Sequence, residues 1–280
     1  MATITAKDVQ ELRAETGQPM LDCKNALTEA GGDRARAIEI LQKKSKGKLE
    51  KLTDRTTGEG RIGIYVNDTR TVGGIVEVRC ETAPVAKNEL FVDLADQLAR
   101  AVAAQSDPDP AAEKMLTAPA AGGRTLNDLV TEVYGKLREK IVVVGGRRVA
   151  GTYLSSYVHH DGKSGVLMAF DAKPSKDAIG PDLCQHAIFT RPLAIDRAGV
   201  PAAEVDKVRA MAREVAVADK KPPQIVDKIV DGKVNAFYSE KTLMEQEHVK
   251  PDYESKRVKD VLAASGVNAV TDMVIMRVGG

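Results

Sequence analysis

Apolar residues recur every three or four positions through the first fifty residues, which predicts three short helices. Thr5 and Asp8 have the spacing of a capping box, and Gly17 suits the left-handed end of the first helix. Asp33 is a candidate cap for the third helix. The apolar sides of the second and third helices are expected to contain Met20, Leu21, Ala26 and Leu27, and Ala37, Ile38 and Leu41. Residues 1–50 are therefore interpreted as a small helical domain, a size more typical of recognition than of catalysis.

A polar segment follows, from Lys43 to Arg61. Its basic residues form a loose run that consists of Lys43, Lys44, Lys46, Lys48 and Lys51. We interpret the segment as solvated chain, with residues 51–60 as a linker. Contact of the run with an acidic protein or with RNA is the alternative.

From Arg61 onwards the pattern becomes that of strands. Two segments rich in Ile and Val, 61–66 and 72–80, flank a polar turn and predict a hairpin. Further along, the pattern predicts a helix over 88–104, a loop over 107–123, a helix over 126–139 and a strand over 141–144.

The second half repeats this order, which predicts two related subdomains. A hairpin is expected over 152–158 and 165–170, and a helix over 177–189. Tyr157-Val158 before the second turn matches Tyr65-Val66 before the first. We therefore expect an α+β fold, with one core subdomain over 61–140 and another over 141–201 and 239–280.

An antiparallel helical hairpin is predicted to interrupt the second subdomain at residues 202–238. Its helices, 202–218 and 224–237, are separated by Lys220-Lys221-Pro222-Pro223. Their expected apolar faces are Val205, Val208, Met211 and Val215, and Ile225, Ile229 and Phe237. Such a projection is typically a docking or dimerising arm. A helix over 255–264 and a strand over 270–278 close the chain.

Composition narrows the class of function. The 41 Lys and Arg residues against 40 Asp and Glu residues give a net charge of +1, which argues against direct nucleic-acid binding through bulk charge. Three widely separated cysteines indicate reduced thiols rather than disulfides. Because no apolar run reaches 18 residues and the first residues lack a signal-peptide pattern, we expect a cytoplasmic protein that does not bind membranes.

Motifs for chemistry are scarce. The sequence contains no phosphate loop and no metal-ligand spacing, and His186 and His248 stand alone. Gly145-Gly146-Arg147-Arg148 is interpreted as a turn with exposed arginines rather than an anion site, and Cys80 as a structural thiol. We therefore predict no catalytic residue, no metal and no cofactor, and a protein that acts on another protein.

Several motifs resemble those of the elongation factor Ts family, and they cover essentially the whole chain in order. The first signature is Leu12-Arg13-Ala14-Glu15-Thr16-Gly17, Met20-Leu21-Asp22-Cys23-Lys24-Asn25-Ala26-Leu27 and Gly32-Asp33, and the second is Cys80-Glu81-Thr82 with Val85-Ala86-Lys87-Asn88. Later matches are Tyr157-Val158-His159, Gly165-Val166-Leu167, Lys228-Ile229-Val230-Asp231-Gly232-Lys233, Phe237-Tyr238 and Leu243-Met244-Glu245-Gln246.

This resemblance implies a three-helix N-terminal domain like ubiquitin-associated domains, two related α+β core subdomains and a protruding helical hairpin. It implies a guanine-nucleotide exchange factor in translation, and not an enzyme. Such a factor binds GDP-bound elongation factor Tu, disturbs the Mg²⁺ and phosphate site, and stays bound until GTP enters. One-to-one and dimer-of-heterodimers complexes both remain open.

The resemblance also assigns roles to particular residues. Arg13, Met20, Leu21 and Lys24 would meet the partner's GTPase domain, although helix core is an equal alternative for Met20 and Leu21. Thr82, Ala83, Pro84 and Val85 would form the loop that dislocates Mg²⁺. Tyr157 and His159 would lie where the second subdomain meets the partner's far domain.

Two positions depart from the family pattern. Ala83-Pro84 stands where members usually carry Asp-Phe, so that both an apolar wedge and a charge are missing, and His248 stands at a position that is usually Phe. We expect exchange to persist through the remaining interface. A binding partner or chaperone of elongation factor Tu that has lost exchange is the alternative, and an RNA-binding factor that uses the lysine run is a weaker one.

Overall fold

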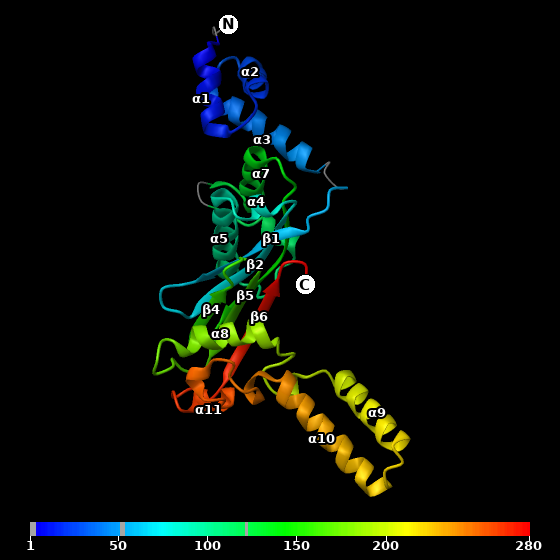
Figure 1. The fold of residues 1–280 in the computed structure, drawn as a ribbon. Helices are drawn as coiled ribbons and strands as arrows, with labels where there is room; N and C mark the ends of the chain where they lie inside the picture. The colour runs from blue at the N-terminus through cyan, green and yellow to red at the C-terminus, as the bar shows by residue number, and fades with distance from the viewer. Residues whose placement is uncertain (1–3, 51–53, 121–122) are drawn as a thin grey trace.

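The computed structural model describes residues 4–50, 54–120 and 123–280 (Figure 1). In chain order these residues form a helical unit, a core built on two sheets, and a helical hairpin that projects from the far end of the core. Two predicted segments lie partly outside the described residues. They are the linker, at residues 51–53, which include Lys51 of the basic run, and the 107–123 loop, at residues 121–122. No helix within the described ranges is long and apolar enough to cross a membrane.

The first unit consists of α1 (Ala6–Thr16), α2 (Met20–Glu29) and α3 (Arg34–Glu50). The predicted capping box is present, and Gly17 ends α1 with φ at 65°. The small core of this unit consists of Val9, Leu12, Cys23, Ala26, Leu27, Ala30, Ala37 and Leu41. The interpretation of the segment from Lys43 as solvated chain is wrong for its first part, because α3 continues to Glu50. Its lysines favour helix, and Ser45 of the same segment is buried.

The first sheet has the order β1-β2-β3 and is antiparallel. Its strands are β1 (Glu59–Val66), β2 (Val72–Cys80) and β3 (Val142–Ala150). The predicted β1–β2 hairpin is confirmed, and Asn67 Oδ1 holds its turn by accepting hydrogen bonds from the N–H groups of Thr71 and Val72. The expected division at residues 140 and 141 is wrong, because the strand after it completes this first sheet.

The glycine pair in β3 explains that error. Gly145 and Gly146 pair with β2 instead of forming a turn, and Arg147 and Arg148 continue the strand. A Cβ atom on Gly146 would lie 2.8 Å from Val102 Cγ2, so the glycine allows a helix to approach the sheet closely. The arginines are not free either, since Arg147 pairs with Asp272 and Arg148 donates to the carbonyl of Ala103.

Helices α4 (Ala83–Ala86), α5 (Glu89–Ala104), α6 (Ala112–Leu116) and α7 (Leu126–Leu137) belong to this first sheet's subdomain. The predicted loop over 107–123 therefore contains a short helix. The expected apolar face of α5 is partly confirmed, because Leu94, Leu98 and Val102 are fully buried. Leu90, which the same spacing places on that face, is 39% exposed, and Phe91 is buried instead.

The second sheet has the order β4-β5-β6, and its strands are β4 (Tyr153–Val158), β5 (Ser164–Phe170) and β6 (Val270–Arg277). Helices α8 (Ile179–Thr190) and α11 (Val258–Ala263) complete its outer core. Both subdomains thus place a hairpin first, helices next and a third strand last. Short 3-10 turns also lie at Arg197–Gly199, Leu243–Glu245 and Pro251–Tyr253.

The two sheets pack against each other through a shared apolar layer, which consists of Ile62, Ile75, Val149, Leu154, Leu167, Ala169 and Val274. Alternate residues of the same strands face the helices, as in Val166, Met168 and Phe170 of β5. The core is therefore four layers thick, with a helix layer outside each sheet (Figure 1).

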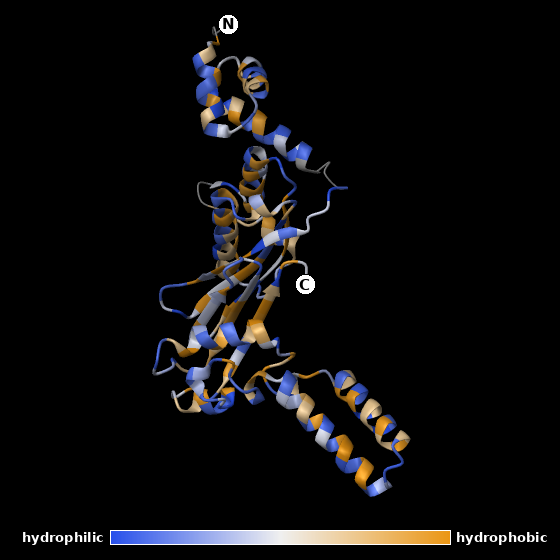
Figure 2. Ribbon diagram, in the orientation of Figure 1, coloured by the Kyte–Doolittle hydropathy of each residue, from blue (hydrophilic) through white to orange (hydrophobic). Residues whose placement is uncertain are grey.

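The hairpin consists of α9 (Ala202–Ala218) and α10 (Pro223–Lys241). Its predicted faces are partly wrong, because the buried seam is made of small residues, Val205, Ala212, Ala216, Val226, Val230 and Val234. Met211 and Val215 are instead 67% and 62% exposed, and hydrophobic positions follow both helices in Figure 2. Small side chains let the two helices approach closely, so the larger ones remain outside.

Candidate partner-binding surface

The first signature forms an exposed surface on the N-terminal unit. Arg13 of α1 and Met20, Leu21 and Lys24 of α2 are all exposed, with Met20 at 41% and Leu21 at 67%. The prediction that Met20 and Leu21 share the buried side of α2 is therefore wrong. That side is formed by Cys23, Ala26 and Leu27, and the first turn of α2 extends beyond this core.

A shallow groove lies between the start of α1 and the outer side of α2. Its volume is about 410 Å³, and its lining residues are Ile4, Thr5, Ala6, Val9, Gln10, Met20, Lys24 and Thr28. Met20 and Lys24 are four residues apart, so they lie on one face of the helix. A flexible thioether beside a cation and an exposed leucine forms a surface suited to burial against another protein.

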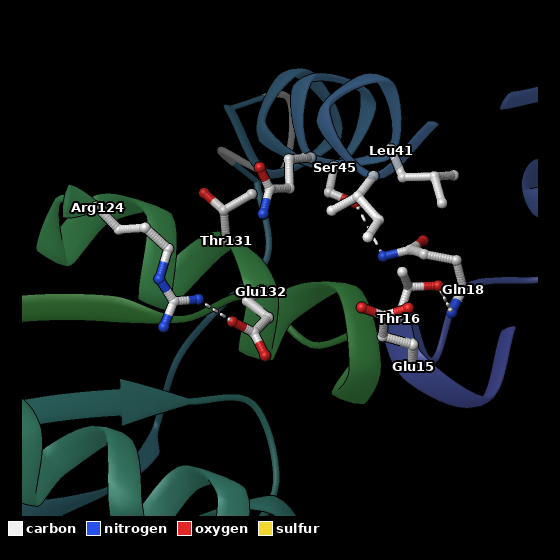
Figure 3. A pocket seen from close by; sticks show the side chains of 10 residues that line it. Glu15, Thr16, Gln18, Leu41, Ser45, Arg124, Thr131 and Glu132 are labelled. Atoms are coloured by element: carbon white, nitrogen blue, oxygen red, sulfur yellow. Dashed lines mark hydrogen bonds and ion pairs between the residues drawn. The ribbon is translucent and has the colours of Figure 1, made fainter. Parts of the chain in front are cut away.

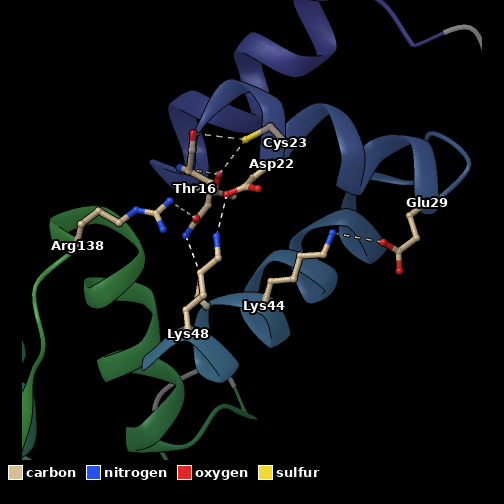
Figure 4. Close-up of polar contacts among 9 residues, drawn as sticks. Thr16, Asp22, Cys23, Glu29, Lys44, Lys48 and Arg138 are labelled. Carbon is tan, nitrogen blue, oxygen red and sulfur yellow. Dashed lines mark hydrogen bonds and ion pairs between the residues drawn. The ribbon is translucent and has the colours of Figure 1, made fainter. Parts of the chain in front are cut away.

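Polar contacts hold α2 on the unit from the opposite side (Figure 4). Lys48 Nζ lies 3.2 Å from Asp22 Oδ2, and Lys44 Nζ lies 3.5 Å from Glu29 Oε2. Burial raises the pKa of the Cys23 thiol, which therefore acts as a small core residue. Two lysines of the basic run are thus occupied by carboxylates of α2.

The second signature forms a single helical turn rather than the expected loop. Thr82 has extended backbone and precedes α4, whose four residues begin with Ala83 and Pro84. Proline suits this place because the first turn of a helix leaves its N–H groups unpaired. Thr82, Ala83 and Pro84 are exposed, and Val85 packs against the first core, so the turn presents its first half to solvent.

A carboxylate from a distant segment holds the start of this turn. Glu139, between α7 and β3, accepts hydrogen bonds from the N–H groups of Glu81 and Thr82 at 3.2 and 3.0 Å, and from the Thr82 hydroxyl at 2.5 Å. In return, Glu81 Oε1 accepts from the N–H of Lys140 at 2.6 Å, which holds the pKa of Glu81 below its usual value. Sequence reasoning missed Glu139, because nothing in its local pattern relates it to Thr82.

The N-terminal unit contacts the core through α7. Gln18 is the central residue, since its Nε2 donates to Ser45 Oγ at 3.1 Å and its Oε1 accepts from Arg138 at 2.6 Å. A cavity of about 190 Å³ lies beside this contact, with Thr131 and the Arg124–Glu132 ion pair on its wall (Figure 3). Arg138 directly precedes Glu139, so one connection contacts both the N-terminal unit and the turn.

Tyr157 and His159 lie in the second subdomain, at the end of β4 and in the turn after it. The Tyr157 hydroxyl lies 3.3 Å from His159 Nδ1, and the rings of His159 and Phe189 form a T-shaped pair with centroids 6.0 Å apart. Phe189 of α8 is 59% exposed. Its place at a helix end gave no sequence signal that separates it from a core aromatic.

Buried histidines form a structural network rather than a metal site. His186 and His248 stand alone in the sequence, but their rings stack 5.0 Å apart. His186 Nε2 lies 2.9 Å from Gln246 Oε1, and both Nδ1 atoms accept backbone N–H groups, from Val249 and Lys250. Burial lowers the pKa of His248 to about 4 and also lowers that of His186. Within residues 4–50, 54–120 and 123–280, no group of three metal-binding side chains occurs.

Cys80 is buried at the end of β2, and its Sγ lies 3.3 Å from the carbonyl of Thr82. Burial and the nearby Glu139 carboxylate raise the pKa of this thiol to about 12. A thiol with so high a pKa is a poor nucleophile at neutral pH. Cys80 is therefore a structural thiol at the end of β2.

Comparison with known proteins decides the family. The profile described as "Elongation factor TS" matches residues 81–280. Elongation factor Ts of Bordetella petrii is 43% identical over 253 residues, which cover 90% of this chain and 84% of the relative. The chain belongs to the elongation factor Ts family.

Other relatives extend this match across the whole length. Elongation factor Ts of Bordetella avium is 40% identical over 280 residues, covering 100% of this chain and 92% of the relative. That of Aquifex aeolicus is 37% identical, covering 95% and 94%. Residues 12–33, which lie outside the profile match, thus fall within a full-length match to an elongation factor Ts. The family's name places the chain among the elongation factors of protein synthesis.

Proposed function

We propose that the chain binds elongation factor Tu in its GDP-bound and nucleotide-free states and promotes release of GDP. Membership of the elongation factor Ts family supports this proposal. The observation that carries it is the exposed surface of Arg13, Met20, Leu21 and Lys24. Two large apolar side chains in solvent on the same helix as the Lys24 cation are the chemistry of a protein contact. The complex persists until GTP enters.

The mechanism is linkage between two binding events. A partner that holds the nucleotide-free state more tightly than the GDP state weakens GDP binding by the same factor. The N-terminal unit supplies contact with the GTPase domain, the turn Thr82–Val85 disturbs its Mg²⁺ and phosphate site, and Tyr157 and His159 contact a further domain. No bond is made or broken in this chain, so the activity is exchange in the cytoplasm without a cofactor rather than enzymatic conversion.

Ala83 and Pro84 give the turn a different chemistry from the Asp-Phe pair of the family pattern. Neither residue carries a charge or a large apolar group, but the Pro84 ring fixes its backbone within α4. In this proposal the turn acts through its shape and its rigid backbone, and the exposed α2 surface supplies affinity.

Stopped-flow release of a fluorescent GDP from elongation factor Tu tests the proposal. We expect the release rate to rise with the concentration of this chain and to reach a plateau well above the intrinsic rate. An unchanged release rate at a concentration where binding is complete would remove exchange from the proposal.

A second candidate is a binding partner or chaperone of elongation factor Tu without exchange activity. The missing Asp-Phe pair favours it, because the turn then lacks both the wedge and the charge. Restoring that pair with Ala83→Asp and Pro84→Phe separates the candidates. Release that appears only in the restored variant would identify the natural chain as a binder.

Direct contact with nucleic acid is not part of the proposal. Lys44 and Lys48 of the basic run form ion pairs with Glu29 and Asp22, so they offer less free charge to phosphate groups. A shallow salt dependence of any RNA affinity would agree with this account, whereas a steep one would restore the RNA-binding alternative.

A further inference from the structure

We propose that Glu139 is a positioning residue for GDP release, because its carboxylate fixes the orientation of the turn Thr82–Val85. The inference rests on the proposed function, since it assigns a role within that activity. Glu139 lies outside both signatures, 57 residues from Thr82.

The contacts of Glu139 use both carboxylate oxygens. Oε2 accepts from the backbone N–H groups of Glu81 and Thr82, and Oε1 accepts from the Thr82 hydroxyl. Hydrogen bonds to an ionised acceptor are roughly twice as strong as neutral ones. The three donors belong to two consecutive residues, so the carboxylate fixes both the position and the rotation of the backbone at the start of α4.

The turn needs such an anchor. Helix α4 has only four residues, and the side chain of its N-cap residue, Thr82, makes no capping hydrogen bond. An isolated helix of this length is unstable in water because nucleation is unfavourable. Val85 and Ala86 anchor the inner half through the core, but the exposed half contains Ala83 and Pro84, which offer no polar side chain. The described contacts of Glu139 therefore hold the part of the turn that faces a partner.

A reciprocal contact strengthens the arrangement. Glu81 Oε1 accepts the backbone N–H of Lys140 and pairs with Arg55 at 2.9 Å. The segments Glu81–Thr82 and Glu139–Lys140 are thus joined in both directions by backbone donors and side-chain acceptors. Each carboxylate holds the other segment's backbone, which resists rotation better than a single contact.

The same connection also contacts the N-terminal unit. Arg138 donates to Gln18 Oε1, and Gln18 in turn donates to Ser45 of α3. Of these two consecutive residues, Arg138 contacts the unit that carries the α2 surface, and Glu139 contacts the turn. This juxtaposition gives a partner held on α2 a fixed relation to Thr82–Val85, which is what displacement of a bound ion by position requires.

The experiment measures GDP release from elongation factor Tu with full-length variants. Glu139→Ala removes all three contacts, and Glu139→Gln keeps neutral acceptor capacity at one atom. The matched control is Glu132→Gln, which removes the same charge from an α7 side chain that pairs with Arg124 and Lys136 and has no contact with the turn.

We expect Glu139→Ala to lower the plateau release rate about 10-fold, with a smaller loss for Glu139→Gln. The concentration for half-maximal release should change by less than about 3-fold, because the α2 surface is intact. Glu132→Gln should match the natural chain in both quantities. Hydrogen exchange at the Thr82 amide should accelerate about 10-fold or more in Glu139→Ala alone, because that amide loses its acceptor.

A plateau rate of Glu139→Ala equal to that of the natural chain would overturn the inference. An equal loss in Glu132→Gln would also overturn it, since charge alone would then explain the effect. Should Glu139→Ala fail to fold, Glu139→Gln replaces it as the test, with an expected loss of about 3-fold in the plateau release rate. Absence of any release by the natural chain would instead contradict the proposed function itself.

Discussion

Two regions of the candidate surface differ in how they are built. The α2 surface presents Met20 and Leu21 at 41% and 67% exposure, and the helix below it is held by a small apolar core and by ion pairs on its far side. The turn Thr82–Val85 presents little apolar area, but three hydrogen bonds to Glu139 hold its exposed end. Exposed apolar area is suited to affinity and a fixed backbone to displacement, so we infer that the two regions divide these tasks.

The largest expected effect comes from unfolding the N-terminal unit, which carries the α2 surface, while the turn Thr82–Val85 stays folded. Leu12 is fully buried in the small core under α2, and Leu12→Ala should cost about 3 kcal/mol. We expect hydrogen-exchange protection to fall in α1–α3 alone and affinity for the partner to fall with it. Lys7→Ala, at a side chain 83% exposed on α1, is the control. Equal loss of protection across both sheets would show that the unit does not unfold separately.

The next largest effect concerns the apolar surface itself. Met20→Ala combined with Leu21→Ala should weaken binding by about 2 kcal/mol, or roughly 30-fold, with unchanged thermal stability. Met211→Ala is the matched comparison, since Met211 of the hairpin is 67% exposed like Leu21. Titration calorimetry measures both. An equal loss in Met211→Ala would move the affinity surface to the hairpin.

Mild acid should act first on the buried histidines of the second subdomain, which makes pH a useful contrast with both regions. His248 has a pKa of about 4 in the fold against an ordinary value of 6.5, so the unfolded chain binds the proton first as the pH falls. Protonation of this ring therefore leaves the free energy of unfolding unchanged above about pH 7. Between about pH 6.5 and 4 it lowers that free energy by on the order of 2 kcal/mol. The groups around this ring are His186, Asp182, Lys250 and Tyr253.

Denaturant midpoints between pH 7 and pH 4.5 measure this loss. In His248→Phe the slope in this window should be shallower, because one titrating ring is gone. The exposed turn and α2 lie outside the histidine network, so hydrogen-exchange protection at α8 and the base of α10 should fall first. An unchanged slope in the variant would assign the acid sensitivity to other groups.

The smallest effect should come from the polar contacts behind α2. Asp22 pairs with Lys48, whose side chain is 51% exposed, and Asp22→Asn should change stability by about 0.5 kcal/mol or less. Chemical denaturation at low and high salt gives the value. A loss above about 1 kcal/mol would mean that this ion pair, and not the core under α2, fixes the helix.

Local chemistry made much of the fold predictable. The capping box of Thr5 and Asp8, the left-handed Gly17 and the β1–β2 hairpin all follow from short-range rules. The errors came from places where tertiary packing overrides those rules. Gly146 is typical of a turn in sequence, but it lies in β3, where the close approach of Val102 leaves no room for a side chain. Alanines and valines instead of Met211 form the hairpin seam because close packing favours small side chains.

The candidate site was predictable only through motif resemblance. The resemblance picked out Met20, Leu21 and Thr82, but periodicity alone put the first two in the core. Sequence patterns did not identify Glu139, because a hydrogen bond between residues 57 positions apart leaves no signal in a single sequence. The contact between His186 and His248 was not predicted for the same reason, since only the fold brings their rings together.

The division of tasks is tested most directly by one comparison of GDP release curves from elongation factor Tu. The variants are Met20→Ala with Leu21→Ala, and Pro84→Gly, which frees the backbone of the turn. The account predicts that the first raises the concentration for half-maximal release and keeps the plateau rate, whereas the second lowers the plateau and keeps the concentration. Both variants changing the same quantity in the same way would contradict the division.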